Sequence, residues 1–213
     1  MSCAFDLAHY AELLAAAQAG GYRFADFGDE PALGDLFLRH DVDLSLDAAV
    51  TMAELEASVG AHAWYFLMRE SIFYNLASDE GTTAILRLKE LGHRVGGHLV
   101  FPDTQLDERL EPVIAWHNPD PEYMSAELDE GINVMSTRYF DPATYRSDSN
   151  QRWRHGCPHE ELRAGAFPWL QLLVHPAIWV YDGETMGETM HSMLDAEKER
   201  RLEQLRADRI DLT

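Results

Sequence analysis

Two aspartates follow an apolar run near the start of the chain, in the segment 36–43, which reads LFLRHDVD. Side chains of a strand alternate between its two faces. We therefore predict that Asp41 and Asp43 point the same way and that His40 and Val42 point the opposite way. Two carboxylates that converge at the end of a buried strand repel each other unless a cation or a shared proton lies between them. The segment predicts a metal site or an acid–base site.

Three further strand-like runs each end in a histidine: His98 after residues 93–97, His117 after 112–116 and His175 after 169–174. In α/β folds, catalytic groups collect at the C-terminal ends of the parallel strands. Carboxylate oxygens and imidazole nitrogens suit zinc, iron, cobalt or nickel, and a catalytic site leaves one position open for water. The metal lowers the pKa of this water, a free carboxylate accepts its proton, and a histidine across the site protonates the leaving amine.

Each of these residues also has a structural interpretation. Asp41 and Asp43 are alternatively a solvated pair before a helix, although an N-cap needs only one such residue. His98 is alternatively a satisfied core or loop histidine, but the glycine pair before it favours a close approach of the backbone to another group. For His117 and His175 the structural interpretation is stronger, because each stands alone in the sequence.

Strands and helices are predicted to alternate along the chain. Apolar and aromatic runs predict strands, and apolar residues at helical spacing, closed by glycines, predict helices. The expected strands cover residues 36–43, 63–68, 93–98, 112–116 and 169–174, and the expected helices cover 4–19, 48–59, 80–91 and about 184–209. This order predicts parallel β/α units in a single α/β domain over residues 1–213, with a layered or barrel architecture.

The last expected helix has two different halves. Met186, Met190 and Met193 form an apolar stripe at its start, and its second half is charge-dense, with Glu197 and Arg201 spaced four apart. We expect a helix that packs on the body of the fold and has a solvated end. A partner-binding helix is the alternative.

The composition bears on partners and on the compartment. The formal net charge of -20 repels nucleic acid phosphates and anionic membranes, so neither is expected as a partner. No apolar run reaches the length of a transmembrane helix, and Asp6 and Glu12 interrupt the region where a signal peptide would lie. We therefore expect a cytoplasmic protein that acts on a small-molecule or glycan substrate; the oligomeric state stays open.

The remaining cysteines and histidines predict little chemistry. Cys3 and Cys157 are too few for a disulfide framework. His155 and His159 flank Cys157, but with no partner pair of cysteines we do not expect a metal cluster there. His93 has the opposite parity to His98 along the strand, so it is expected to be structural.

Five segments in order resemble the motifs of a known family. LRHDVD, GHRVGGH, WHNPDPE, YRSDSNQRW and LQLLVHP, spread over about residues 34–181, resemble the polysaccharide deacetylase superfamily (NodB homology), a group of metal-dependent carbohydrate esterases. The HDVD sequence is similar to the intracellular branch of that family. The resemblance implies a deformed (β/α) barrel with fewer than eight strands, of the glycoside hydrolase/deacetylase type. It also implies hydrolytic removal of an acyl group from an N-acetylated sugar or cleavage of a related amide.

The resemblance assigns roles to individual residues. It implies Asp41 as general base, His175 as general acid, and Asp43 and His98 as ligands of a divalent ion, zinc first, with cobalt, iron or nickel as alternatives. His117 stands where the family has an arginine or histidine that orients the base or completes the site. The SDSNQRW segment resembles the motif that lines the substrate groove, which adds Asp148 and Trp153 as substrate-binding residues.

Three departures from the family pattern bear on activity. Val42 separates the two aspartates, which are adjacent in the family, and Pro102 stands where the family has its second metal histidine. The third metal ligand then comes either from His117 or from a different residue in another loop, or there is no third ligand. The segment after His98 is also too short for a full helical crossover and leaves room for a stub helix at most.

Three functions are compatible with these residues. The first is a metal-dependent deacetylase acting on a small glycan, a sugar nucleotide or a lipid-linked precursor. The second is a catalytically inactive relative that binds a sugar or a protein. Pro102 and the short segment after His98 favour it, and the retained Asp41, Asp43 and His175 oppose it. The third is a hydrolase of other amides, such as ureides, with different loops around the same site.

Overall fold

A parallel sheet forms the centre of the protein. The computed structural model describes residues 3–69, 71–101, 104–118 and 120–212. Its strands are β1 (Arg23–Phe24), β2 (Asp35–Val42), β3 (Trp64–Leu67), β4 (Arg94–Leu99), β5 (Val113–Trp116), β6 (Ile132–Asn133), β7 (Tyr145–Ser147) and β8 (Trp169–Val174). Seven of them are ordered β6-β5-β4-β3-β2-β8-β7, and β1 pairs with β2. All pairs are parallel, and the sheet curls into a half-barrel.

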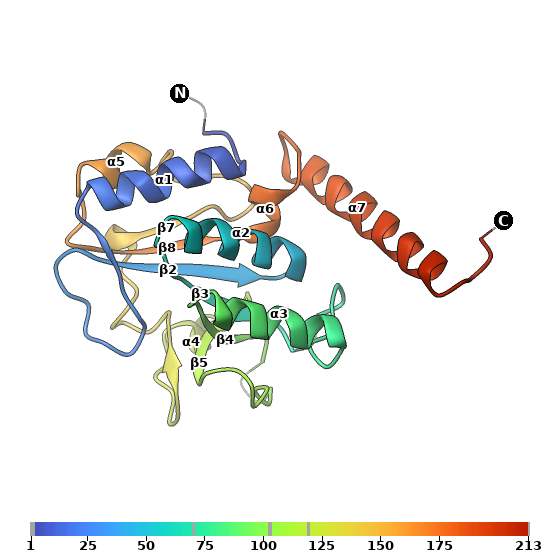
Figure 1. Cartoon of the computed structure of the whole chain (residues 1–213). Helices are drawn as coiled ribbons and strands as arrows, with labels where there is room; N and C mark the ends of the chain where they lie inside the picture. The colour runs from blue at the N-terminus through green and yellow to red at the C-terminus, as the bar shows by residue number, and fades with distance from the viewer. Residues whose placement is uncertain (1–2, 70, 102–103, 119, 213) are drawn as a thin grey trace.

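Helices flank this sheet and project from it. The helical segments are α1 (Leu7–Ala19), α2 (Leu46–Ser58), α3 (Asp79–Glu90), α4 (Pro121–Met124), the 3-10 turn η1 (Pro142–Thr144), α5 (His159–Arg163), α6 (Pro176–Val180) and α7 (Met186–Ala207). In Figure 1, α1, α5 and α6 lie above the strands, α2 and α3 lie in front of them, and α7 extends away from the body. None of the helices among the described residues is long and apolar enough to cross a membrane.

Strand β2 separates two layers of the core. All eight of its residues are buried, so both of its faces must be covered. Leu36 and Leu38 pack in the cluster that α1 and α2 share, whereas Phe37 packs with Phe66 and Tyr139 in a second, largely aromatic cluster. We call the side of the second cluster the inner face. The alternation continues to the end of the strand, which places the side chains of residues 39, 41 and 43 on this inner face.

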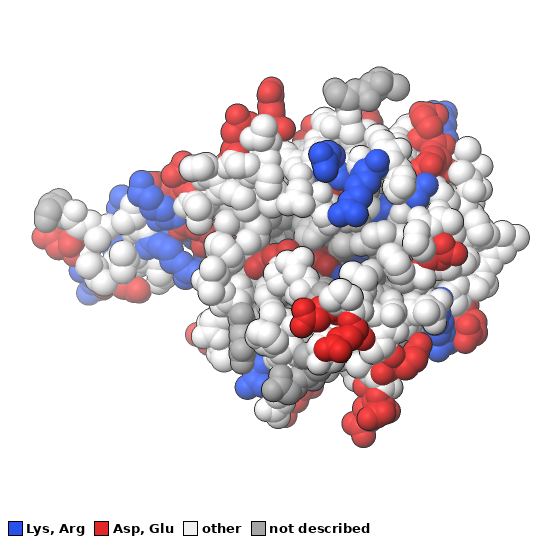
Figure 2. All heavy atoms as spheres, turned by 180° about the vertical axis from the view of Figure 1, so that it is seen from behind, with Lys and Arg blue, Asp and Glu red and all other residues white. Residues whose placement is uncertain are grey.

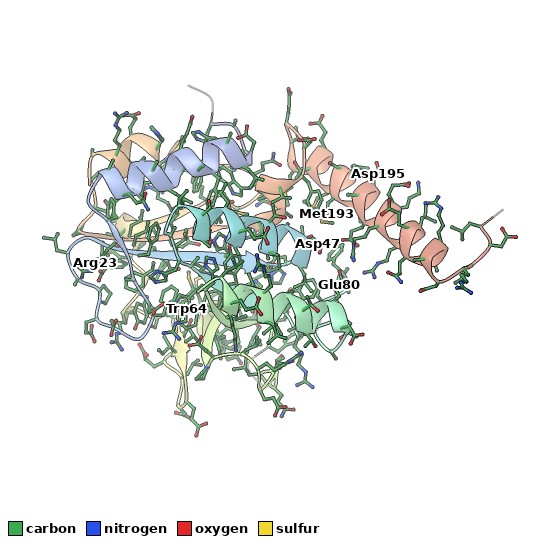
Figure 3. All side chains as sticks on the ribbon, viewed as in Figure 1. Arg23, Asp47, Trp64, Glu80, Met193 and Asp195 are labelled. Carbon is green, nitrogen blue, oxygen red and sulfur yellow. The ribbon has the colours of Figure 1, made fainter. Side chains whose placement is uncertain are left out.

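The last helix buries apolar side chains against the body in its first half and contacts the body further along by ion pairs. Met193 is buried and lies on the side of α7 that faces the body, whereas Asp195 lies on the outer side (Figure 3). Arg200 then reaches back to Glu80 of α3 at 2.7 Å and to Asp47 of α2 at 3.3 Å. Beyond this contact the helix is mostly exposed. The expected packing helix with a solvated end is therefore confirmed.

The main strands and helices lie where the sequence predicts them, with ends that differ by a few residues. β2 ends at Val42, one residue before the expected end, and α1 begins at Leu7 because Asp6 caps it. Between β4 and β5, residues 104–112 contain no helix, so the short crossover is a loop, without even a stub helix in that range. Pro102 lies outside the described residues. The short elements β1, β6, β7 and α4 to α6 were not predicted.

Candidate metal and catalytic site

Three ligand atoms converge at the C-terminal ends of β2, β4 and β5. Asp43 Oδ1 lies 3.0 Å from His98 Nε2 and 3.3 Å from His117 Nδ1, and the two nitrogens are 3.1 Å apart. Ligand atoms bound at 2.0–2.1 Å to one tetrahedral zinc ion lie about 3.3 Å from each other. The three sides of this triangle are therefore close to those of a zinc site before any rearrangement.

The surroundings of these atoms also suit a cation. Asp43 Oδ1 is buried and has no well-oriented hydrogen bond to any described residue. His98 Nδ1 lies 3.0 Å from the Ala115 carbonyl oxygen, and a proton donated to that oxygen leaves Nε2 with a free lone pair toward Asp43. In the metal-free protein burial opposes the ionisation of Asp43, but when His117 and His98 carry a proton toward its carboxylate they outweigh burial and hold its pKa well below the usual range. An ionised carboxylate facing two imidazoles is a donor set that divalent zinc prefers.

Asp41 lies beside this triangle and pairs with Arg39. Arg39 donates from Nε to Asp41 Oδ1 at 2.8 Å and from Nη2 to Oδ2 at 2.7 Å. Burial opposes the ionised form, but the Arg39 charge outweighs it and lowers the pKa of Asp41. Asp41 Oδ2 is also 3.7 Å from His98 Nε2. The aspartate is thus ionised at neutral pH and borders the proposed metal position.

Arg39 is a site residue that the sequence analysis missed. It is 2% exposed, and it also donates from Nη1 to Gln171 Oε1 at 3.2 Å. Its parity with Asp41 and Asp43 along β2 is the signal that could have identified it, since all three share one face of the strand.

His175 faces the triangle from β8, with a buried carboxylate behind it. His175 Nε2 is 3.9 Å from Asp43 Oδ2. Its Nδ1 bonds Asp148 Oδ1 at 2.6 Å, and its backbone N–H donates to Asp148 Oδ2 at 3.0 Å. Burial lowers the pKa of His175, but the charge and hydrogen bond of Asp148 outweigh it and raise the pKa to about 9. His175 is therefore protonated at neutral pH, as a general acid must be.

The two predicted substrate-binding residues lie in different places. Asp148 is completely buried, and Trp179 Nε1 also donates to its Oδ2 at 2.7 Å. It cannot contact a substrate, so the expectation for this residue is corrected: Asp148 positions His175. Trp153 does line the cleft above the site. Its indole N–H donates to Cys3 Sγ at 3.2 Å, and Cys3 is not part of the cleft lining.

A cleft of about 740 Å³ opens over these groups. This volume lies within the range of small-molecule sites, which is about 300–1,000 Å³. Its lining includes Arg39, Asp41, Asp43, His98, His117, His175, Trp116, Tyr145 and Trp153. Figure 2 shows the hollowed face, with acidic side chains inside the hollow. Arg39, both aspartates of the β2 end and the three histidines therefore border one space, and Asp148 lies behind it.

Two other histidines lie on the opposite face of the sheet, as predicted. His40 is fully buried, with Nε2 2.6 Å from Glu56 Oε1 and its ring stacked on Tyr65 at 4.3 Å. His93 donates from Nε2 to the Ala53 carbonyl oxygen at 3.0 Å and accepts at Nδ1 from the Ala63 N–H at 3.1 Å, within the same layer. Both are structural, because neither borders the cleft.

The glycine pair before His98 lets protein groups approach β4 closely. A Cβ atom on Gly96 would lie 2.5 Å from the Val113 carbonyl oxygen and 2.7 Å from the Phe66 ring, and one on Gly97 would lie 2.4 Å from Leu106. The close approach predicted from the sequence is therefore found, and the approaching groups belong to the protein.

The arrangement combines three atoms at metal-ligand spacing, a buried ionised carboxylate and a protonated histidine in one cleft. No protein-family model, curated protein or solved structure matches this chain. The chemistry of the site therefore has to be judged from its geometry.

Proposed function

We propose that this chain is a metal-dependent hydrolase that removes an acyl group from an N-acetylated sugar or a related amide, built on a deacetylase-like deformed barrel. The observation that carries the proposal is the triangle of Asp43, His98 and His117, which has the dimensions of a zinc site and faces His175 across the cleft. The resemblance of five sequence segments to the polysaccharide deacetylases supports the same chemistry.

Asp43, His98 and His117 would hold the ion. His117 would then supply the third ligand, because the family's second metal histidine is replaced by proline at position 102. A divalent ion held there would lower the pKa of a water molecule and polarise a carbonyl group. Three protein ligands leave a coordination position open, as catalytic zinc sites do.

Asp41 and His175 divide the proton transfers. Asp41 is ionised and accepts a proton from the attacking water, and Arg39 holds its carboxylate toward the ligand triangle. His175 donates a proton to the departing amine, since Asp148 keeps it protonated. The carboxylate and the protonated imidazole therefore serve as base and acid in the same turnover.

The cleft favours a small, partly apolar substrate. Trp116, Tyr145 and Trp153 supply apolar surface, and Asn118 and Ser147 supply hydrogen-bonding groups. A pocket of this kind buries a ligand on its aromatic walls and orients it with a few polar contacts. An N-acetylated mono- or disaccharide, free or linked to a nucleotide, has this combination of ring faces and polar groups.

The test measures metal content and acyl release together. We expect metal bound per chain, determined by elemental analysis after purification without chelators, to fall by one equivalent in Asp43→Ala and in His98→Ala. We expect His191→Ala, in an exposed histidine of α7, to leave it unchanged. Acetate release from a panel of N-acetylated sugars and sugar nucleotides should be lost in the same two variants.

Two results would overturn the proposal. Wild-type protein that binds no metal at this position, even with added zinc or cobalt, and releases no acetate would indicate a non-catalytic relative. Metal-dependent turnover of ureides but of no N-acetylated sugar would assign the site to another class of amide.

A further inference from the structure

A second group of ligand atoms lies outside the cleft, where three distant parts of the chain meet. Cys3 belongs to the segment before α1, His9 to the first turns of α1, and Cys157 to the loop between β7 and α5. Their Sγ, imidazole nitrogen and Sγ atoms all lie within 4.8 Å of one another, and His9 Nε2 is 3.2 Å from Cys157 Sγ. In the sequence, Cys157 stands beside His155 and His159, and nothing there relates it to Cys3 or His9.

The imidazole of His9 is oriented for metal binding. Its Nδ1 lies 2.9 Å from Glu12 Oε2, one turn later on α1. A proton on Nδ1, donated to this carboxylate, leaves the lone pair of Nε2 directed toward the sulfur of Cys157. Histidines that bind metals in proteins usually donate their second N–H to a carboxylate or carbonyl in this way.

The sulfur of Cys3 also has an outer partner. Trp153 Nε1 donates to Cys3 Sγ at 3.2 Å, and N–H donors of this kind stabilise a metal-bound thiolate. Both cysteines are half-buried, so an ion between them would be partly shielded from water. Each of Cys3 and His9 thus has a supporting contact with a residue outside the group.

The distances between the three ligand atoms require a small adjustment to fit one ion. Around a tetrahedral zinc ion with Zn–S of about 2.3 Å and Zn–N of about 2.0–2.1 Å, ligand atoms lie about 3.5–3.8 Å apart. The 3.2 Å between His9 Nε2 and Cys157 Sγ is about 0.3 Å shorter than this, and the other two separations are at most 4.8 Å. Shifts of about 1 Å or less therefore bring the three atoms to tetrahedral spacing. Cys3 lies outside any helix or strand, so a shift of its side chain can provide this change.

We infer that Cys3, His9 and Cys157 form a second transition-metal site, of the thiolate type that binds zinc, separate from the site in the cleft. Soft thiolate ligands favour zinc over magnesium or calcium, and binding releases the two thiol protons to solvent. Three protein ligands leave the fourth position to water. The ion would fasten the start of the chain to the loop that carries Trp153, and so to one wall of the cleft.

Cobalt distinguishes this site from the one in the cleft. Full-length protein, reduced and freed of metal by a chelator, is titrated with Co²⁺ and followed by absorption spectroscopy. A thiolate-to-cobalt charge-transfer band in the near ultraviolet can come only from the cysteine site, because Asp43, His98 and His117 supply no sulfur. We expect the band in the wild type and in Asp43→Ala, and its loss in Cys157→Ser and Cys3→Ser. His155→Ala, beside Cys157, is the matched control and should keep the band.

A stability measurement covers the case in which a serine variant folds poorly. In the Asp43→Ala background, zinc at 100 times its Kd should raise Tm by about 5–10 °C, and His9→Ala in the same background should abolish this rise. No thiolate band in the wild type, or a zinc response that His9→Ala does not change, would overturn the inference. A Cys3–Cys157 disulfide that persists under reducing conditions would do the same. None of these results bears on metal binding in the cleft. The inference about the cysteine site and the proposed function of the cleft are therefore tested independently.

Discussion

Asp148→Asn tests the claim that a buried carboxylate keeps His175 protonated. The side chain keeps its size, but an amide offers one oxygen where the aspartate bonds His175 Nδ1, the His175 backbone N–H and Trp179 Nε1. We therefore expect the pKa of His175 in the metal-free protein to fall from about 9 to its ordinary value of 6.5 or below. Burial, which lowers this pKa, is then opposed by the charges of Asp41 and Asp43, which act more weakly than Asp148.

The shift predicts a change of stability in a defined pH range. The folded pKa of His175 lies above the unfolded value, so its stabilisation is fully present below about pH 6.5 and is lost as the pH rises to about 9. A difference of about 2.5 pKa units at about 1.4 kcal/mol each corresponds to about 3 kcal/mol. Asp148→Asn should therefore lower the free energy of unfolding by about 3 kcal/mol more at pH 6 than at pH 9.5. Any destabilisation that does not depend on pH adds equally at both pH values.

Two measurements check this expectation. Urea unfolding of metal-free wild type and variant at the two pH values gives the difference in free energy, and NMR titration of the imidazole gives the pKa of His175 directly. Glu160→Gln, an exposed carboxylate beside His159, is a control that should show no such pH dependence. Equal destabilisation at both pH values, with an unchanged His175 pKa, would refute the assigned role of Asp148.

The remaining predictions concern β2 and β4. Asp41→Asn should keep the metal but lower turnover by about 10²–10⁴-fold, because the amide cannot accept the proton; a fully active variant would refute the base assignment. His40→Ala should cost about 3–5 kcal/mol in urea unfolding while kcat of the folded protein changes little, because it leaves Glu56 buried without its imidazole partner. Lost activity at unchanged Tm would contradict this. Gly96→Ala should cost about 1–3 kcal/mol, because its Cβ would overlap the Val113 carbonyl oxygen; wild-type stability would show that β4 can shift freely.

Much of the site was determined by local sequence. The period of two along β2 placed Asp41 and Asp43 together and His40 opposite them, since side-chain alternation follows from strand geometry alone. Apolar runs ending in His98, His117 and His175 indicated residues at the carboxyl ends of strands, and parallel pairing brings such ends to one edge. The same alternation would have identified Arg39.

Other features were decided only by the tertiary structure. Strand order and loop paths determine which side chains meet, and these depend on contacts between residues far apart in the chain. Asp148 looked like a groove residue, but the pairing of β7 with β8 places it behind His175, where both oxygens are bonded within the protein. Cys3 and His9 meet Cys157 only because α1 packs beside α5, a contact that no spacing along the chain encodes.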